Sequence, residues 1–223
     1  MRATVADAGH GRDVTLVCVT KYASLEHTAA LASAGGQHLG ENLLPAGALK
    51  FAALREQGLN FTAHMLGPLQ SRKAVLCAQT CNWYQALERI EIAQKIEDEL
   101  SRVGRRMDTL IQLHVGGEDR KHGISQIQLE SFIEQVAALT HLRIRGLMCI
   151  PPGPSCFLSP AVYEAQTRKA FRQMASLFAR MRTGYAELPI DTLSMGMSGD
   201  YRWAIEEGAT MVRIGRALFE GLS

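Results

Sequence analysis

The sequence predicts an α/β protein, a single closed (β/α)8 barrel of the TIM type in which residues 1–223 form one domain. Eight short apolar or β-branched runs alternate with longer segments of helical period, which is typical of parallel strands joined by crossover helices. Open doubly wound sheets usually stop at about five to seven strands, so eight alternations favour a closed barrel. No linker and no break in composition divides the chain, and its length suits one barrel domain.

The eight predicted strands are short runs bounded by turn-forming residues. They span 14–20, 37–39, 61–66, 82–86, 109–115, 143–150, 192–195 and 210–214. Helical segments such as 90–103 and 163–181 repeat Leu, Ala, Ile, Phe or Met every three or four residues, so each is expected to cover part of the barrel wall. Ser24 is placed to cap the first crossover helix, and Gly35 and Gly36 are placed to end it in a left-handed conformation.

Composition and charge exclude several classes of protein. Hydrophobic residues make up 47% of the chain and charged residues 21%, which is typical of a folded globular protein. The 24 basic and 22 acidic side chains are spread along the chain, so no basic stripe indicates nucleic acid or an anionic membrane as a partner. The longest apolar run is far shorter than the roughly 18 to 20 residues of a membrane span, and residues 1–13 lack the apolar core of a signal peptide. A cytoplasmic location is therefore expected.

The cysteine pattern indicates reduced thiols. Five cysteines occur at irregular spacing, and two of them lie in predicted strands. Cys77 and Cys81 are four residues apart, which is also the spacing of a metal-binding pair on a helix. No histidine or acidic partner stands at zinc-ligand spacing, so no metal site is predicted.

Lys21 is the first candidate site residue. It directly follows the apolar run VTLVCVT. In a (β/α)8 barrel, the loops that leave the carboxyl ends of the strands build the site. A lysine at this position would enter the barrel mouth and lose water, which would free its amine for Schiff-base chemistry. The alternative is a lysine that extends from the strand end into solvent.

Two glycine-containing loops stand where such barrels often bind phosphate, after the last two strands. The segment SMGMSGD, 194–200, contains glycines that let backbone amides approach an anion, and Ser198 adds a hydroxyl. After the last predicted strand, Gly215 and Arg216 open a short helix. The alternative for these glycines is ordinary turn geometry.

Arg213 lies near the end of the last predicted strand, where its guanidinium could point into the barrel mouth. An arginine that donates to a pyridine nitrogen would keep that nitrogen unprotonated, because two cationic donors there would repel each other. A ring held in this state is a poor electron sink. The alternative is an arginine paired with an acidic residue on the barrel rim.

Seven segments together resemble the pyridoxal phosphate (PLP) homeostasis family, the single-barrel relatives of the alanine racemase N-terminal domain. They are VCVTK (17–21), LGEN (39–42), HMLGPLQSRK (64–73), EDRKHGI (118–124), RIRGLMCIPP (143–152), LSMGMSGD (193–200) and MVRIGRALF (211–219). The resemblance covers nearly the whole chain. It implies a barrel of the alanine racemase N-terminal type with PLP as its cofactor.

The resemblance also implies roles for individual residues. Lys21 would form the Schiff base with the PLP aldehyde, and Arg213 would face the pyridine nitrogen. Asn42 and His64 match residues that line the cofactor in the family.

The phosphate would be held by Ser198 and by the backbone amides of Gly215 and Arg216. The sequence also departs from the family pattern. Arg216 replaces a small hydroxyl residue beside the phosphate, where it would add a charged donor. Tyr22 follows the lysine where the family usually has a second lysine or a proline soon after. The first helix is shortened, since only about thirteen residues precede Val14.

These observations favour a monomeric carrier that buffers PLP and hands it to apo PLP-dependent enzymes, without substantial turnover. Racemases of the related fold add a β domain whose tyrosine acts on the opposite face of the cofactor, and 223 residues cannot hold that domain. The alternative is a weak racemase or lyase that uses Lys21, with His64 or Lys121 as a second base. An adaptor for nucleic acid or protein has little support, because the chain lacks a basic patch.

Overall fold

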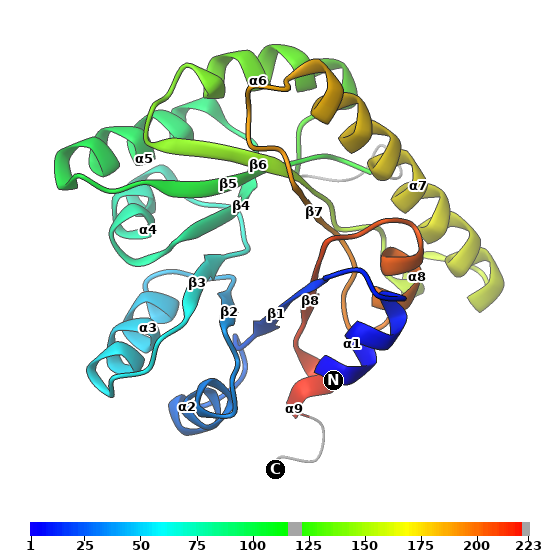
Figure 1. Ribbon diagram of the computed structural model, residues 1–223, viewed down its shortest axis with the longest axis horizontal. Helices are drawn as coiled ribbons and strands as arrows, with labels where there is room; N and C mark the ends of the chain where they lie inside the picture. The colour runs from blue at the N-terminus through cyan, green and yellow to red at the C-terminus, as the bar shows by residue number, and fades with distance from the viewer. Residues whose placement is uncertain (116–121, 220–223) are drawn as a thin grey trace.

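The computed structural model describes residues 1–115 and 122–219 of the chain. Eight parallel strands form one closed barrel in chain order, and β8 pairs back onto β1 (Figure 1). The strands are β1 (Thr15–Val19), β2 (His38–Glu41), β3 (Thr62–Met65), β4 (Trp83–Leu87), β5 (Met107–Gln112), β6 (Leu142–Met148), β7 (Thr192–Ser194) and β8 (Met211–Ile214). The predicted (β/α)8 barrel is confirmed.

Helices connect successive strands on the outside of the barrel (Figure 1). The α-helices are α1 (Arg2–Ala8), α2 (Leu25–Ser33), α3 (Ala46–Glu56), α4 (Ala74–Thr80), α5 (Ile90–Val103), α6 (Leu129–Ala137), α7 (Pro160–Gly184), α8 (Tyr201–Glu206) and α9 (Arg216–Phe219). Short 3-10 turns are η1 (Ser71–Lys73), η2 (Gln126–Gln128) and η3 (Pro154–Cys156). α1, the helix before the first strand, has 7 residues and packs against α8.

Capping residues explain where the helices begin and end. The bounds of α5 match the prediction, and Gly104 ends this helix in the left-handed conformation with a φ of 65°. Ser24 caps α2 as predicted, since its side chain accepts a hydrogen bond from the third residue on. Gly35 is left-handed with a φ of 91°, whereas Gly36 is not, so only the first of these glycines ends the helix as predicted. The prediction of 163–181 for α7 was too short at both ends.

β2 ends at Glu41, two residues beyond the end of the predicted strand 37–39. Gly40 belongs to the strand because the wall is tightly packed there, and a Cβ at this position would lie 2.6 Å from Cδ1 of Leu66. Glu41 is buried in the strand because Lys50 pairs with its carboxylate at 2.8 Å. A buried charge of this kind is tolerated only with a partner.

β5 begins two residues before the predicted strand 109–115 and ends three residues before its predicted end. The barrel ladder ends at Gln112, and Leu113 instead forms an isolated bridge with Ile124. The amide of Ile124 donates to the carbonyl of Gln112 at 2.9 Å, which closes this short excursion. The apolar run therefore continues past the end of the strand, and periodicity alone could not separate the two parts.

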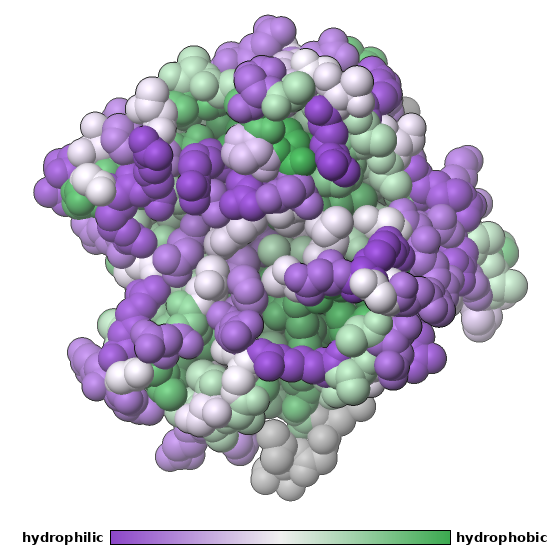
Figure 2. Space-filling model, in the orientation of Figure 1, coloured by the Kyte–Doolittle hydropathy of each residue, from purple (hydrophilic) through white to green (hydrophobic). Residues whose placement is uncertain are grey.

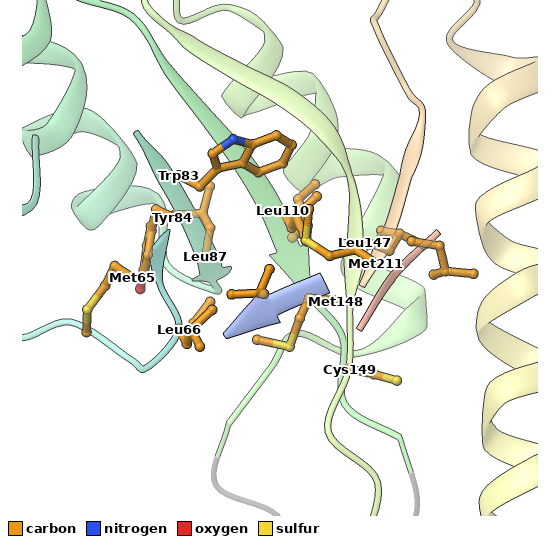
Figure 3. Close-up of a cluster of buried hydrophobic side chains, with 14 of the residues drawn as sticks. Met65, Leu66, Trp83, Tyr84, Leu87, Leu110, Leu147, Met148, Cys149 and Met211 are labelled. Atoms are coloured by element: carbon orange, nitrogen blue, oxygen red, sulfur yellow. The ribbon is translucent and has the colours of Figure 1, made fainter. Parts of the chain in front are cut away.

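Buried apolar side chains from the strands and from the inner faces of the helices form one continuous core. Figure 3 shows side chains from several strands gathered in a cluster, among them Met65, Leu87, Leu110, Met148 and Met211. Each of these side chains is at most 3% exposed. Burial of one such side chain contributes about 1.5–3 kcal/mol, so the cluster provides a rigid frame for the loops above it.

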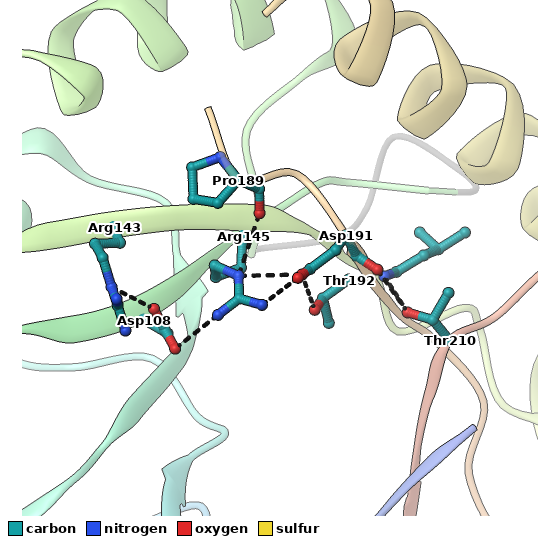
Figure 4. A network of polar contacts seen from close by, with 8 residues as sticks. Asp108, Arg143, Arg145, Pro189, Asp191, Thr192 and Thr210 are labelled. Atoms are coloured by element: carbon teal, nitrogen blue, oxygen red, sulfur yellow. Dashed lines mark hydrogen bonds and ion pairs between the residues drawn. The ribbon is translucent and has the colours of Figure 1, made fainter. Parts of the chain in front are cut away.

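An ion-pair network closes the amino-terminal ends of β5, β6 and β7 (Figure 4). Asp108 on β5 pairs with Arg143 at 2.8 Å and with Arg145 at 3.1 Å, both on β6. Arg145 also pairs with Asp191, just before β7, and lies over the ring of Trp83. These charges lie at the opposite end of the barrel from the strand ends that carry the candidate site, so they stabilise the fold.

Hydrophilic residues cover much of the face seen in Figure 2, and apolar side chains are visible in the hollows between them. Within residues 1–115 and 122–219, no helix is long and apolar enough to cross a membrane. None of the five cysteines, all of which lie in the described part of the chain, forms a disulfide. The described residues contain no cluster of three or more side chains that could hold a metal ion.

Candidate functional site

Closure of the barrel brings distant parts of the chain together at one end. It places the carboxyl ends of β7, β8, β1 and β2 side by side, in that order. Val17 lies opposite Arg213 in the ladder between β1 and β8. Gly215 lies against the end of β1, because a Cβ there would be 3.2 Å from the Cβ of Val19. Lys21, which follows β1, therefore lies near the loop that follows β8.

Lys21 is exposed at this end of the barrel. Its Nζ lies over the ring of Tyr22 at 4.8 Å from the ring centroid. The expected withdrawal of this lysine from water is not seen, and the side chain extends into solvent as the alternative described. Its backbone, by contrast, is held firmly.

An ion pair between half-buried Lys50 and buried Glu41 anchors the turn that carries Lys21. Nζ of Lys50 on α3 donates to the carbonyls of Thr20 at 2.7 Å and of Ala23 at 3.0 Å, and pairs with Glu41 at 2.8 Å. The hydroxyl of Thr20 also donates to Glu41 at 2.7 Å. These contacts hold the backbone on both sides of Lys21. The backbone of Lys21 is therefore fixed in position, while its side chain is exposed.

Asn42 lies half-buried, directly after the end of β2. A Cβ at Gly67 would be 2.4 Å from the carbonyl oxygen of Asn42, so the turn after β3 packs against this residue and requires glycine. Asn42 is thus held between the ends of β1 and β3. Its contact with a cofactor stays a prediction.

Arg213 points into the barrel and is only 4% exposed. Its Nη1 donates to Oγ of Ser194 at 2.7 Å, and its Nη2 donates to the carbonyl of Cys149 at 2.9 Å. Within the described ranges, no carboxylate forms a direct ion pair with Arg213. Burial lowers the pKa of Arg213, and the nearby negative charge of Asp200 opposes this shift. A guanidinium has five N–H donors, so these two contacts do not exhaust its capacity.

His64 lies inside the barrel on β3 and is fully buried. Its Nδ1 is 2.9 Å from Nε2 of Gln85, its Nε2 is 3.0 Å from Nδ1 of His38, and its ring stacks on Trp83. Burial, helped by the repulsion of His38, holds the pKa of His64 well below its usual value of 6.5. Both nitrogens of this neutral ring are engaged by protein groups. Lys121, the other residue considered as a base, lies outside the described residues.

The loop between β7 and α8 is held in one conformation by close contacts. Gly196 has a φ of 94°, and a Cβ there would lie 2.6 Å from the Cβ of Ala204. Its carbonyl accepts from the amide of Arg213 at 3.0 Å. The carboxylate of Asp200 accepts from the amide of Met197 at 2.6 Å, and burial raises the pKa of this acid. The loop is thereby tied to β8.

The remaining predicted phosphate contacts lie on this loop and on the one after β8. Ser198 is half-buried at the turn of the first loop, Gly215 is half-buried after β8, and Arg216 is exposed as the first residue of α9. The two loops are brought together because β7 and β8 are neighbours in the barrel. The individual phosphate contacts stay predictions.

These groups suit a ligand that combines an anion with an electrophilic carbon. Lys21 supplies an accessible amine, Arg213 a buried cation and Ser198 a hydroxyl. In addition, Oε1 of Gln112, the last residue of β5, is buried without a hydrogen-bond partner among the described residues. A buried orphan acceptor at this end of the barrel is what a missing polar ligand would leave behind.

Sequence reasoning missed several residues that support the site. Glu41 and Lys50 hold the turn that carries Lys21. Ser194 accepts a hydrogen bond from Arg213 and donates one to Gln85. One signal was present, since Gln85 is a polar residue in the middle of the apolar strand WYQAL. A buried amide in such a run needs a partner, which indicates an interior polar network.

Comparisons with known proteins agree with this geometry. Residues 3–222 match the model of the family described as alanine racemase, N-terminal domain. The chain is 36% identical over 206 residues to a protein of Pasteurella multocida strain Pm70 named pyridoxal phosphate homeostasis protein, with 92% of this chain and 85% of that protein covered. A protein of the same name from Escherichia coli strain K12 is 36% identical over 208 residues, which is 93% of this chain and 85% of that one.

A solved structure shows the same likeness. PipY of Synechococcus elongatus PCC7942, solved with PLP bound, superimposes with a TM-score of 0.82 at 30% sequence identity, with 92% of each chain covered. The chain belongs to the alanine racemase N-terminal domain family and, within it, to the pyridoxal phosphate homeostasis proteins.

Proposed function

We propose that this protein binds PLP as a Schiff base on Lys21 and acts as an intracellular PLP carrier and buffer. The observation that carries the proposal is the convergence of an accessible lysine, a buried arginine and the loops after the last two strands at one barrel end. The PLP found in PipY and the names of the relatives support the same cofactor. PLP supplies an aldehyde that condenses with a lysine amine, and the protein residues bind and orient it.

Each residue has a separate task in this proposal. The turn held by Lys50 and Glu41 presents the amine of Lys21 at the mouth. Arg213 donates toward the pyridine nitrogen and keeps it unprotonated. Ser198 and the amides of Gly215 and Arg216 receive the phosphate, Asn42 lies beside the cofactor, and His64 belongs to the buried polar network that contacts Arg213 through Gln85 and Ser194.

The test is the visible absorption of the purified protein after incubation with PLP. The wild-type chain is expected to show the absorption band of lysine-bound PLP, and Lys21→Ala is expected to lose it while the far-ultraviolet circular dichroism stays unchanged, because this residue is exposed. Lys95→Ala removes another exposed lysine, on α5, and serves as the matched control. Reduction with borohydride followed by peptide mapping identifies the lysine. A pyridoxyl group on Lys73 would show that the assignment is wrong.

We infer further that turnover is negligible. An arginine at the ring nitrogen gives a poor electron sink, and His64 offers no ring nitrogen to a substrate, because Gln85 and His38 occupy both. Incubation of the PLP-loaded protein with L-alanine in D₂O is expected to give no D-alanine and no Cα deuteration above the rate with free PLP. Rapid deuteration would instead support the competing function, a weak racemase or lyase.

The proposal includes the partners and the setting. The chain acts as one PLP-binding domain and as a monomer, and the acceptors of its cofactor are apo PLP-dependent enzymes. The reduced cysteines are compatible with the cytoplasm. Transfer is tested by mixing the loaded protein with an apo PLP-dependent enzyme and a PLP-trapping phosphatase. Reactivation that survives the phosphatase supports direct transfer.

A further inference from the structure

A continuous chain of hydrogen bonds crosses the interior of the barrel from the candidate site toward the opposite end. It starts at Arg213, which donates to Oγ of Ser194 at 2.7 Å. The chain then passes through Gln85, whose Oε1 accepts from Ser194 at 2.8 Å and whose Nε2 lies 2.9 Å from Nδ1 of His64. It ends at His38, the half-buried first residue of β2, 3.0 Å from His64.

The orientation of the Gln85 amide, with Oε1 toward Ser194 and Nε2 toward His64, fixes the direction of every hydrogen bond in this series. Arginine can only donate, so Oγ of Ser194 accepts and its own proton points to Oε1 of Gln85. The amide nitrogen of Gln85 then donates to Nδ1 of His64. A neutral imidazole has one donor and one acceptor, so His64 carries its proton on Nε2.

The same chain explains how the guanidinium keeps its orientation without a carboxylate. Arg213 is 4% exposed, and its two described acceptors are a hydroxyl and a backbone carbonyl. A serine hydroxyl rotates freely unless its proton has a fixed acceptor. Ser194 and Gln85 are both 0% exposed, so no water competes for that acceptor. Gln85 therefore determines where the lone pairs of Ser194 point.

We propose that Ser194 and Gln85 are positioning residues that orient Arg213 toward the ring nitrogen of the cofactor and set the tautomer of His64. This inference rests on the proposed function, because it takes the ring nitrogen as the target of Arg213. His64 acts on the cofactor only through Gln85, from within the barrel. The polar groups of the interior thus belong to the site although they do not touch the ligand.

The first test uses the protein without PLP. Ring ¹⁵N chemical shifts of histidine distinguish the two tautomers, and His64 is expected to carry its proton on Nε2. An ionised carboxylate can only accept, so Gln85→Glu is expected to move that proton to Nδ1. A proton on Nδ1 in the wild-type protein, or a tautomer that is unchanged in Gln85→Glu, would overturn the proposed direction of the chain.

The second test measures PLP binding and the visible band. Ser194→Ala and Gln85→Leu are each expected to weaken PLP binding about tenfold and to shift the band, because Arg213 loses its fixed acceptor. Gln85→Glu keeps an acceptor for Ser194 and is expected to retain most of the affinity. Thr109→Val is the matched control, since it also removes one buried hydroxyl, which donates to the carbonyl of Tyr84.

Arg213→Met separates positioning from a general loss of stability. In that background, Ser194→Ala is expected to have no further effect on PLP affinity or on the band, because it acts through the arginine. Additive losses, or an equal loss in Thr109→Val, would overturn the proposal. If the wild-type protein forms no band with PLP, the proposed function fails. The tautomer of His64, measured without PLP, still shows whether the series of hydrogen bonds from Arg213 to His38 exists. Ser194→Ala, which removes one oxygen, keeps the test valid if Gln85→Leu does not fold.

Discussion

Lys50 shows how a single residue outside the cofactor motifs can control the position of a reactive group. Its Nζ contacts two carbonyls of the turn around Lys21 and the carboxylate of Glu41. The side chain of Lys50 is 16% exposed and that of Glu41 is 5% exposed, so water screens this pair poorly. The pair therefore ties α3, β2 and the lysine turn together.

Replacement of this lysine tests its role. Lys50→Met is expected to lower the free energy of unfolding by about 3 kcal/mol, because it leaves the buried carboxylate of Glu41 without its cation. It is also expected to weaken PLP binding, because the turn loses both carbonyl contacts. Urea unfolding and titration with PLP measure the two effects.

Two variants complete this experiment. Glu41→Gln in the Lys50→Met background is expected to recover part of the lost stability, since a neutral amide is less costly to bury than a carboxylate. Lys95→Met, at an exposed position, is expected to change neither quantity. If Lys50→Met also changed neither the free energy of unfolding nor the PLP affinity, the turn would be held by other contacts.

At the scale of elements, the loop between β7 and α8 depends on one glycine. Gly196→Ala places a methyl group 2.6 Å from the Cβ of Ala204 at a φ of 94°. It is expected to destabilise the protein by about 2 kcal/mol, because it combines an unfavourable backbone conformation with a clash. The shifted loop moves Ser198, so the affinity for PLP is expected to fall at least about fivefold. The affinity for pyridoxal, which lacks the phosphate, is expected to be the same in Gly196→Ala as in the wild-type protein.

Gly199 in the same loop provides the control. No heavy atom lies within 4 Å of a Cβ built there, and its φ is not positive. Gly199→Ala is therefore expected to change stability by less than about 0.5 kcal/mol. Equal losses of PLP and pyridoxal affinity in Gly196→Ala would contradict a phosphate site on this loop.

The predictions for individual elements were accurate where local chemistry sets the boundary. The bounds of α5 were predicted correctly, because an amphipathic period ends at Gly104, which takes a left-handed conformation. The bounds of β2 and β5 were wrong, because tertiary contacts decide them. Lys50 allows Glu41 to be buried at the end of one strand, and Ile124 draws the chain out of the barrel after the other.

At the scale of the whole molecule, the buried His64 couples folding to pH. Burial lowers the pKa of His64 well below 6.5 in the folded state, whereas the unfolded chain has the usual value. The unfolded state therefore binds more protons below pH 6.5. The contribution of His64 to the free energy of unfolding is therefore fully present above pH 6.5. Below pH 6.5 the free energy of unfolding is expected to fall by about 1.4 kcal/mol per pH unit for one histidine that stays neutral in the folded state.

Urea unfolding at pH 7.5, 6.5 and 5.5 measures this dependence. His64→Gln is expected to have a shallower slope between pH 6.5 and 5.5 than the wild-type protein. His10→Asn, at an exposed position whose φ of 48° suits asparagine, is expected to keep the wild-type slope. Parallel slopes for the wild type and His64→Gln would show that this histidine does not remain neutral in the folded protein.

The sequence by itself determined the class of the fold and the segments that carry the chemistry. Eight alternations predicted the barrel, and the residues after the strands predicted where Lys21 and the two glycine loops lie. Periodicity and turn chemistry are local properties, so a single chain is enough to read them. Only the tertiary structure decided that Arg213 points inward onto Ser194, and that His64 is enclosed by Gln85 and His38. Such contacts join residues from different strands, and only barrel closure brings them within hydrogen-bond distance.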